Sequence, residues 1–174
     1  MATHKSVHAR VALALIMGLM LAGAQPRVAN FEQRILSSHN HERAIVGVNA
    51  LIWDETLAQN AQAWADELVS TRAFKHSPSY KGAVREGENI WGGTPQAFTP
   101  EGMVALWINE KRQFVSGTFP RNSTTGRVDD VSHYTQLIWR RTNAVGCGLG
   151  RGDHEEVLVC RYSEAGNVRG FRPL

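Results

Sequence analysis

Apolar residues recur at helical spacing through two stretches in the first half of the chain. Residues 31–46 form the first predicted helix, which ends at Gly47. Its apolar face comprises Phe31, Ile35, Leu36 and Ile45. Asp54 is a good N-cap for a second helix that runs to Val69, in which apolar residues follow at spacings of three and four. These residues are Leu57, Ala61, Trp64, Ala65 and Leu68.

A third helix is predicted after a long loop rich in glycine, proline and serine. The loop covers residues 74–96 and contains a short strand near residues 88–91. The helix begins at residues 99–101, where a threonine cap, a proline and an early acid follow one another. Val104, Trp107, Ile108 and Lys111 run along it.

The last third of the chain contains three predicted strands after the polar loop GTFPRNSTTGRVDD. They are HYTQLIW at residues 133–139, AVGCGLG at 144–150 and EVLVCRYS at 156–163. Helices that come first and strands that cluster late predict an α+β domain with a sheet dominated by antiparallel pairs. Trp53, Trp64, Trp107 and Trp139 are expected in its core, and His39, Asn40 and Arg43 are expected to anchor the first helix to the sheet by hydrogen bonds.

The first 24 residues have the pattern of a secretory signal peptide. A positive, acid-free start precedes the apolar run VALALIMGLMLAG, and the small residues of Ala22-Gly23-Ala24 fit a signal-peptidase site. The run is short for a bilayer span, and no second apolar stretch follows it. We therefore expect cleavage after residue 24 and one domain over residues 25–174, with no stable membrane insertion of the mature chain. An uncleaved anchor is the alternative.

Cleavage changes the charge of the chain. The first 24 residues carry two of the 19 lysines and arginines and none of the 16 acids, so the formal net charge falls from +3 to +1. The sequence shows no clustered basic stripe, and the basic pI therefore gives little support to a nucleic-acid partner or to an anionic membrane as partner. The 150 residues that remain suit one ordinary domain with a single core.

The only two cysteines are Cys147 and Cys160. In a secreted protein such a pair predicts a disulfide. The segment between them has a glycine-rich polar turn flanked by apolar residues, so a hairpin would bring the two together. A redox or metal pair would need a different spacing, such as C-x-x-C.

Four titratable residues stand in apolar or aromatic surroundings: His76, Glu88, Glu110 and His133. Burying a carboxylate or an imidazole costs free energy unless a partner satisfies it. The four could form a mutually satisfied cluster, or offer two imidazoles to Zn²⁺ with carboxylates beside them. The residues alone favour four unrelated structural roles over a shared site, because the sequence contains no local metal signature such as H-E-x-x-H.

Several motifs resemble the CAP superfamily of cysteine-rich secretory proteins, antigen 5 and pathogenesis-related protein 1. The matches run in the family's order from about Phe31 to the C-terminus. They are SHNHERAIVGVNALIWDETLAQNAQAWADEL, GENIWGG, LWINEKRQF, HYTQLIW and CRYSEAGN. The chain departs from the family in having a single cysteine pair, in Ser132 where many members have glycine, and in Glu164 where proline is common.

The resemblance implies a three-layer α-β-α sandwich, the SCP domain, with a large surface cleft. His76, Glu88, Glu110 and His133 match the family's cleft tetrad, whose two histidines can bind a divalent metal such as zinc. His133 would then begin its strand because the end of that strand forms one wall of the cleft.

The function expected from this resemblance is that of a secreted, extracellular binding protein in defence or signalling, or a periplasmic one in a Gram-negative bacterium. Its ligand would be a small apolar molecule, such as a sterol or fatty acid, or a protein partner. The alternative is a metal-dependent hydrolase or peptidase in which Glu88 or Glu110 is the general base. A third possibility is a precursor, because the tail AGNVRGFRPL resembles a peptide that some plant relatives release.

Overall fold

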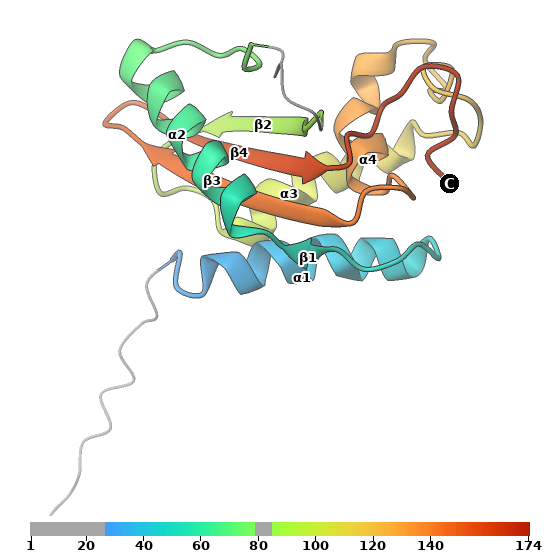
Figure 1. Cartoon of the computed structure of the whole chain (residues 1–174). Helices are drawn as coiled ribbons and strands as arrows, with labels where there is room; N and C mark the ends of the chain where they lie inside the picture. The colour runs from blue at the N-terminus through green and yellow to red at the C-terminus, as the bar shows by residue number, and fades with distance from the viewer. Residues whose placement is uncertain (1–26, 79–84) are drawn as a thin grey trace, which may run out of the picture.

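A four-stranded sheet lies between helices on both of its faces (Figure 1). The computed structural model describes residues 27–78 and 85–174, so the expected signal peptide lies outside the described residues. The helices are α1 (Phe31–Ile45), α2 (Glu55–Thr71), α3 (Pro100–Asn109) and α4 (Ser132–Leu137), with short 3-10 helices at Glu110–Arg112 and Val128–Asp130. The strands are β1 (Ile52–Trp53), β2 (Gly87–Gly93), β3 (Ala144–Arg151) and β4 (Glu156–Ser163).

The strand order in the sheet is β1-β3-β4-β2. β4 pairs antiparallel with both of its neighbours, and only the two-residue β1 runs parallel to β3. The expected α+β class and antiparallel-dominated sheet are therefore confirmed. Every residue of β2 is paired with a residue of β4, and Glu88 lies directly opposite Arg161.

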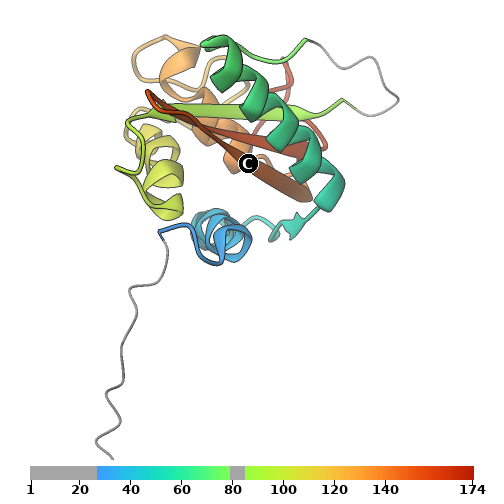
Figure 2. The same cartoon turned by 90° about the vertical axis from the view of Figure 1, so that its left-hand side faces the viewer.

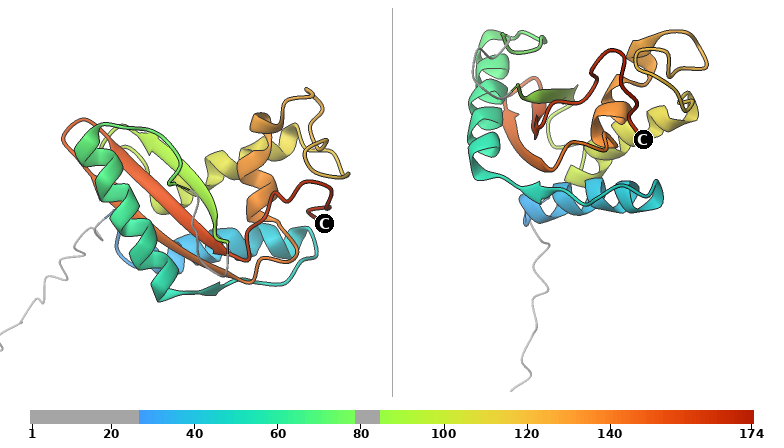
Figure 3. Two further views of the ribbon diagram at one scale, coloured as in Figure 1. Left: turned by 45° about the horizontal axis from the view of Figure 1, so that its top comes forward. Right: turned by 45° about the vertical axis from the view of Figure 1, so that its right-hand side comes forward.

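The helices form two layers with the sheet between them. α2 covers one face, along β3 and β4, and α1 and α3 cover the other (Figures 2 and 3). The main core lies on the α1 and α3 side and includes Trp107, Leu137 and Tyr162, whereas a smaller cluster with Val157 and Val159 lies under α2. This is the predicted three-layer sandwich.

Glycines allow α2 to approach the sheet closely. Gly146, Gly148 and Gly150 occupy alternate positions of β3, so all three point to the α2 face. A Cβ atom on Gly148 would overlap the backbone of Gln62 in α2, and one on Gly146 would overlap the backbone of Ala58. The helix backbone fills the space that side chains would otherwise need.

Local capping signals position α2 and α3 as the sequence predicts. Asp54 Oδ1 accepts a hydrogen bond from the backbone N–H of Leu57 (2.9 Å), and Thr99 Oγ1 accepts one from Gly102 (3.2 Å). Each bond satisfies a donor that has no partner within the first turn of its helix.

The inner face of α1 differs from the apolar face predicted for it. Ile35 is fully buried, but Ile45 is 62% exposed. The buried positions of α1 are Ile35, His39, Glu42 and Arg43, and three of these are polar. Polar side chains are tolerated there because each of them has hydrogen-bond partners. The spacing of apolar residues in the sequence does not show these partners.

Arg43 supplies the most extensive of these bonds. Its guanidinium is fully buried and donates to the carbonyl oxygens of Asn49 (2.7 Å), Leu137 (2.9 Å), Trp139 (3.0 Å) and Thr142 (2.9 Å). It therefore ties α1 to the segment between α4 and β3, rather than to the sheet.

His39 is the predicted anchor that does reach the sheet. Its Nε2 lies 2.9 Å from the Tyr162 hydroxyl on β4, and its Nδ1 lies 2.8 Å from the Ile35 carbonyl oxygen. Burial lowers the pKa of His39 to about 4, so the ring is neutral at physiological pH. Asn40 instead bonds both backbone groups of Leu51, just before β1.

The strand predicted for HYTQLIW is wrong, since residues 132–137 form helix α4. Residues 134–139 are all buried, so burial in this run follows neither a helical nor an alternating period, and a short run of this kind does not distinguish a strand from a helix by its pattern alone. The decisive factor is remote in sequence. Glu110 Oε2 accepts hydrogen bonds from the backbone N–H groups of His133 and Tyr134, both at 3.0 Å, and so caps the first turn.

The predicted disulfide is present. Cys147 and Cys160 lie directly opposite each other on β3 and β4, with their Cα atoms 4.1 Å apart, and are bonded. Two of the predicted core tryptophans, Trp107 and Trp139, are buried, whereas Trp53 and Trp64 are only half-buried. Across residues 27–78 and 85–174, none of the helices combines the length and apolar composition that crossing a bilayer requires.

The C-terminal tail packs into the domain beside α4 (Figure 1). Asn167 donates to the Ser132 carbonyl oxygen (2.8 Å), and the backbone of Arg140 donates to Pro173 (2.8 Å). Pro173 is buried, and Leu174 contacts the main core. Release of this tail as a peptide would therefore break contacts that hold α4 in place.

Candidate functional site

The four predicted site residues form two histidine–glutamate pairs. In the first pair, His76 Nδ1 lies 2.6 Å from Glu88 Oε1, which also accepts a hydrogen bond from the backbone N–H of Ser77 (3.0 Å). The imidazole of His76 is two-thirds exposed, whereas Glu88 is nearly buried. The carboxylate thus fixes the orientation of a ring that faces solvent.

In the second pair, His133 Nδ1 lies 2.6 Å from Glu110 Oε1. Trp107 stacks on the His133 ring, with 6.0 Å between the ring centroids and 13° between the planes. Since the other oxygen of Glu110 caps α4, one carboxylate positions both the helix and the imidazole at its start.

Arg161 contacts Glu88 of the first pair, and the sequence patterns did not predict this contact. Its Nη1 donates to Glu86 (3.0 Å), and its Nε lies 3.2 Å from Glu88 Oε2. That Glu88 oxygen is buried and accepts no hydrogen bond of good geometry from the described residues. Arg161 is only 9% exposed, so its charge acts on Glu88 with little screening. Only the pairing of β2 with β4 reveals this neighbour.

Both pairs adjoin β2, an edge strand of the sheet. Glu88 points to the α2 face with Arg161, and the next residue, Asn89, points to the opposite face, where it donates to the His133 carbonyl oxygen (3.1 Å) and to the Tyr162 hydroxyl (3.2 Å). Among residues 27–78 and 85–174, no group of three or more His, Cys, Asp and Glu side chains is close enough to hold one metal ion together.

A polar pocket of about 270 Å³ adjoins the first pair at the end of β2. His76, Glu88 and Arg161 line it, with Gln136 from α4 and Asn167 from the tail. A second hollow of about 470 Å³ adjoins it along α2, where Trp64 is the aromatic wall. Glu110 and His133 line neither of these two hollows.

The first pair is polarised toward an imidazolium and a carboxylate. The hydrogen bond to Glu88 raises the pKa of His76, and burial opposes it only in part. Burial acts to raise the pKa of Glu88, but hydrogen bonds from His76 and Ser77 and the charge of Arg161 outweigh it, so this pKa is lowered. His76 therefore stabilises the fold below its unfolded-state pKa and loses that contribution as pH rises through its raised value. Glu88 stabilises the fold above its unfolded-state pKa and loses that contribution as pH falls through its lowered value.

We expect His76 to titrate above the ordinary histidine pKa of ~6.5 and Glu88→Gln to bring its pKa below that value. The substitution removes the carboxylate charge, while burial and the positive charge of Arg161, which both lower the pKa, remain. An NMR titration of the His76 ring protons measures the shift.

Glu55→Gln is the matched control, since Glu55 is an exposed acid at the start of α2. It should leave the His76 titration unchanged. An unaltered His76 curve in Glu88→Gln would show that the pair is not formed in solution.

Comparisons with known proteins give consistent results. The family model "CAP: Cysteine-rich secretory protein family" matches residues 36–162. The chain is 33% identical to Pathogenesis-related protein 1C of Nicotiana tabacum over 145 residues, which cover 83% of this chain and 81% of that protein. It is also 33% identical to Venom allergen 5 of Vespa mandarinia over 133 residues, covering 73% of this chain and 62% of that protein.

Solved structures share the fold. The crystal structure of NaASP2 with Zn²⁺ superimposes with a TM-score of 0.68 at 24% identity, covering 87% of each chain. That of MpPR-1i gives a TM-score of 0.58 at 25% identity, covering 81% of this chain and 92% of that one.

Proposed function

The chain belongs to the cysteine-rich secretory protein (CAP) family, and from this premise we propose that it is a secreted, non-enzymatic binding protein that presents His76 and His133 to a ligand. The signal-peptide pattern of residues 1–24 supports secretion. Names of relatives such as Pathogenesis-related protein 1C support a role in defence.

The observation that carries the proposal is the way each imidazole is held. In both pairs a glutamate occupies Nδ1 at 2.6 Å, which leaves Nε2 as the ring nitrogen that can bind a ligand. Metal-binding histidines typically have such a carboxylate behind them, because it fixes the ring and raises its basicity. A divalent metal such as Zn²⁺ therefore fits the chemistry of these residues.

The residues fit a weak site rather than a closed one. Structural zinc sites use four protein ligands, and no cluster of three acidic, cysteine or histidine side chains exists in the described part of the chain. His76 and His133 would hold the ion, with water completing its shell, and the ion would supply a positive charge that a polar ligand can bind. The crystal structure of NaASP2 with Zn²⁺ supports the choice of metal.

We expect Zn²⁺ to bind the metal-stripped protein, and His133→Ala to weaken that binding by more than about tenfold. Affinity should fall with decreasing pH, since a protonated imidazole cannot ligate. The raised pKa of His76 means that this loss begins at a higher pH than for an ordinary histidine. Calorimetric titration at neutral and mildly acidic pH measures both effects.

His154→Ala is the control, because His154 is an exposed histidine in the turn between β3 and β4. It should bind Zn²⁺ as the wild type does. Equal affinity in the wild type and His133→Ala would contradict the proposal and leave the two pairs with structural roles.

The surroundings of the carboxylates do not favour the hydrolase alternative. The lowered pKa of Glu88 makes it a weaker base, and both oxygens of Glu110 already accept hydrogen bonds. Metal-dependent hydrolysis that Glu110→Gln abolishes would nevertheless establish an enzyme.

The lining of the pocket bears on the ligand class. Charged and amide side chains dominate it, and desolvating them against a sterol or fatty acid would cost free energy without compensating hydrogen bonds. We therefore favour a polar ligand or the polar side chains of a protein partner over the apolar ligand that the family resemblance suggests.

A further inference from the structure

Five exposed arginines gather where the C-terminal tail meets two other segments. We call this surface the arginine face and define it as residues 115–121, 140–143 and 164–174. We propose that the arginine face docks the protein on an anionic lipid bilayer. The inference goes beyond the proposed function and does not depend on the metal.

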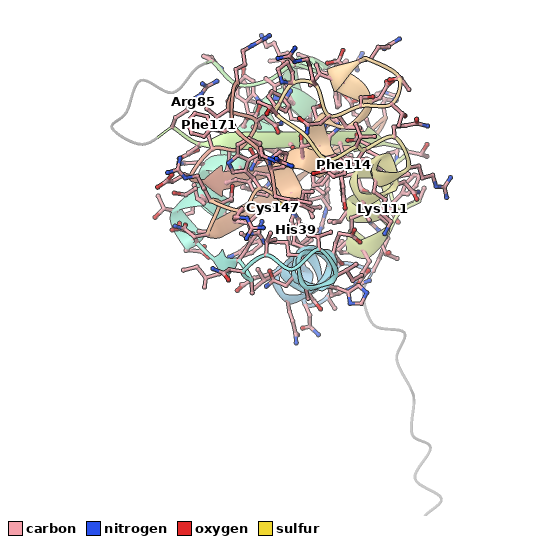
Figure 4. The ribbon with its side chains drawn as sticks, turned by 90° about the vertical axis from the view of Figure 1, so that its right-hand side faces the viewer. His39, Arg85, Lys111, Phe114, Cys147 and Phe171 are labelled. Carbon is pink, nitrogen blue, oxygen red and sulfur yellow. A yellow bond between two sulfur atoms is a disulfide. The ribbon has the colours of Figure 1, made fainter. Side chains whose placement is uncertain are left out.

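Backbone hydrogen bonds assemble the three segments. The N–H of Phe119 donates to the Phe171 carbonyl oxygen (2.8 Å), and the N–H of Gly170 donates to Phe119 (3.0 Å). The N–H of Arg140 donates to Pro173 (2.8 Å). Figure 4 views the molecule from this side, with Phe171 labelled. Since the contacts are regular and reciprocal, the face is a fixed feature of the fold.

The charge of this face is strongly one-sided. Its side chains include five arginines and one acid, Glu164. All five arginines are exposed: Arg121, Arg140, Arg141, Arg169 and Arg172. The mature chain carries a formal net charge of only +1, so the positive charge is concentrated here and balanced elsewhere. No basic stripe is visible in the sequence because the arginines come from three separate segments.

Exposed apolar side chains occur among the arginines. Phe171 is 50% exposed, Val168 41% and Val115 39%. Arg141 lies over the Phe171 ring, 5.7 Å from its centroid, and Arg172 donates to Ser116 (3.2 Å) beside Val115. Basic residues interleaved with aromatic and aliphatic ones are typical of surfaces that rest at the bilayer interface.

The apolar component decides between an anionic bilayer and a soluble polyanion. Both would attract the arginines, but only a bilayer offers hydrocarbon in which Phe171 and Val168 can be buried. Docking would be peripheral and reversible, since the face presents single side chains rather than a spanning helix. It is compatible with the expectation that the mature chain is not stably inserted.

The test is binding of the full mature chain to vesicles. We expect binding to phosphatidylcholine vesicles that contain roughly one third phosphatidylserine, little binding to pure phosphatidylcholine, and release at about 0.5 M salt. Replacing Arg141 and Arg172 by glutamine should weaken binding about twenty-five-fold, because each arginine near an anionic surface contributes about a factor of five.

Replacing Arg72 and Arg151 by glutamine is the matched control, since both are exposed, Arg151 ends β3, and Arg72 lies beside the turn that follows it. It removes the same charge and should leave vesicle binding almost unchanged. If both double variants lose vesicle binding to the same extent, the net charge of the protein explains the binding and the proposal is overturned.

Phe171→Ser tests the apolar part and should weaken vesicle binding about fivefold to tenfold. Val168→Ser is a second variant, at a position that contributes less to the packing of the tail. Thermal unfolding checks that the two serine variants remain folded. Unchanged vesicle binding in both serine variants, together with tight binding of the wild type to dextran sulfate, would assign the face to soluble polyanions instead.

Discussion

Replacing Arg43 by methionine is expected to lower the free energy of unfolding by more than about 3 kcal/mol. Methionine roughly keeps the volume of the side chain but donates no hydrogen bond. Four carbonyl oxygens, on Asn49, Leu137, Trp139 and Thr142, would lose the guanidinium that now bonds them in the interior. An unpartnered buried acceptor costs more than the net gain of an ordinary hydrogen bond, and here several lose their donor at once. Urea unfolding followed by tryptophan fluorescence measures the loss.

Arg112→Met is the control for this experiment. Arg112 is exposed in the 3-10 helix after α3, and its replacement should change stability by no more than about 0.5 kcal/mol. If both variants unfold at the same urea concentration, the bonds of Arg43 do not hold the α4–β3 segment in place.

Gly148→Ala should destabilise the protein by about 3 kcal/mol or more, an effect at the upper end for overpacking. The new methyl group would overlap the backbone of Gln62, which cannot rotate away as a flexible side chain can. α2 would have to move off the sheet, and with it the bonds between the Gln62 side chain and both backbone groups of Leu149. Differential scanning calorimetry measures the fall in melting temperature.

Gly102→Ala makes the same chemical change where there is room for it. Gly102 lies in the first turn of α3, and the nearest atom to a new Cβ would be Thr99 Oγ1 at 3.4 Å. Alanine is the better helix former, so this variant should be neutral or more stable by up to about 1 kcal/mol. A Gly148→Ala protein as stable as Gly102→Ala would show that α2 does not pack as closely as the structure indicates.

The parts of the fold that the sequence predicts correctly are those decided locally. Asp54 and Thr99 cap their helices within three residues, and the glycine-rich turn brings Cys147 and Cys160 into register. Helix α4 was predicted wrongly because its cap is Glu110, more than twenty residues earlier in the chain. A pattern read over a short window cannot include such a partner.

In the candidate site, too, the sequence predicts the residues but not the contacts between distant parts of the chain. Motif resemblance identified His76, Glu88, Glu110 and His133, and the structure supports their grouping only as two pairs. Which glutamate holds which histidine depends on tertiary contacts. Arg161 and the stacking of Trp107 on His133 were missed because strand register and helix packing bring them there. Resemblance to a family carries over residue identities more readily than their mutual geometry.

Glu110 both caps α4 and positions His133, and this combination has an evolutionary consequence. A gene duplicate that no longer needs a ligand can lose His76, since that ring is two-thirds exposed and only Glu88 depends on it. It cannot lose Glu110 as easily, because the same carboxylate caps α4. Glutamate at this position should therefore persist in descendants that have abandoned the ligand. Across the family, retention of His76 should be the better marker of ligand binding, and retention of Glu110 should mark the fold.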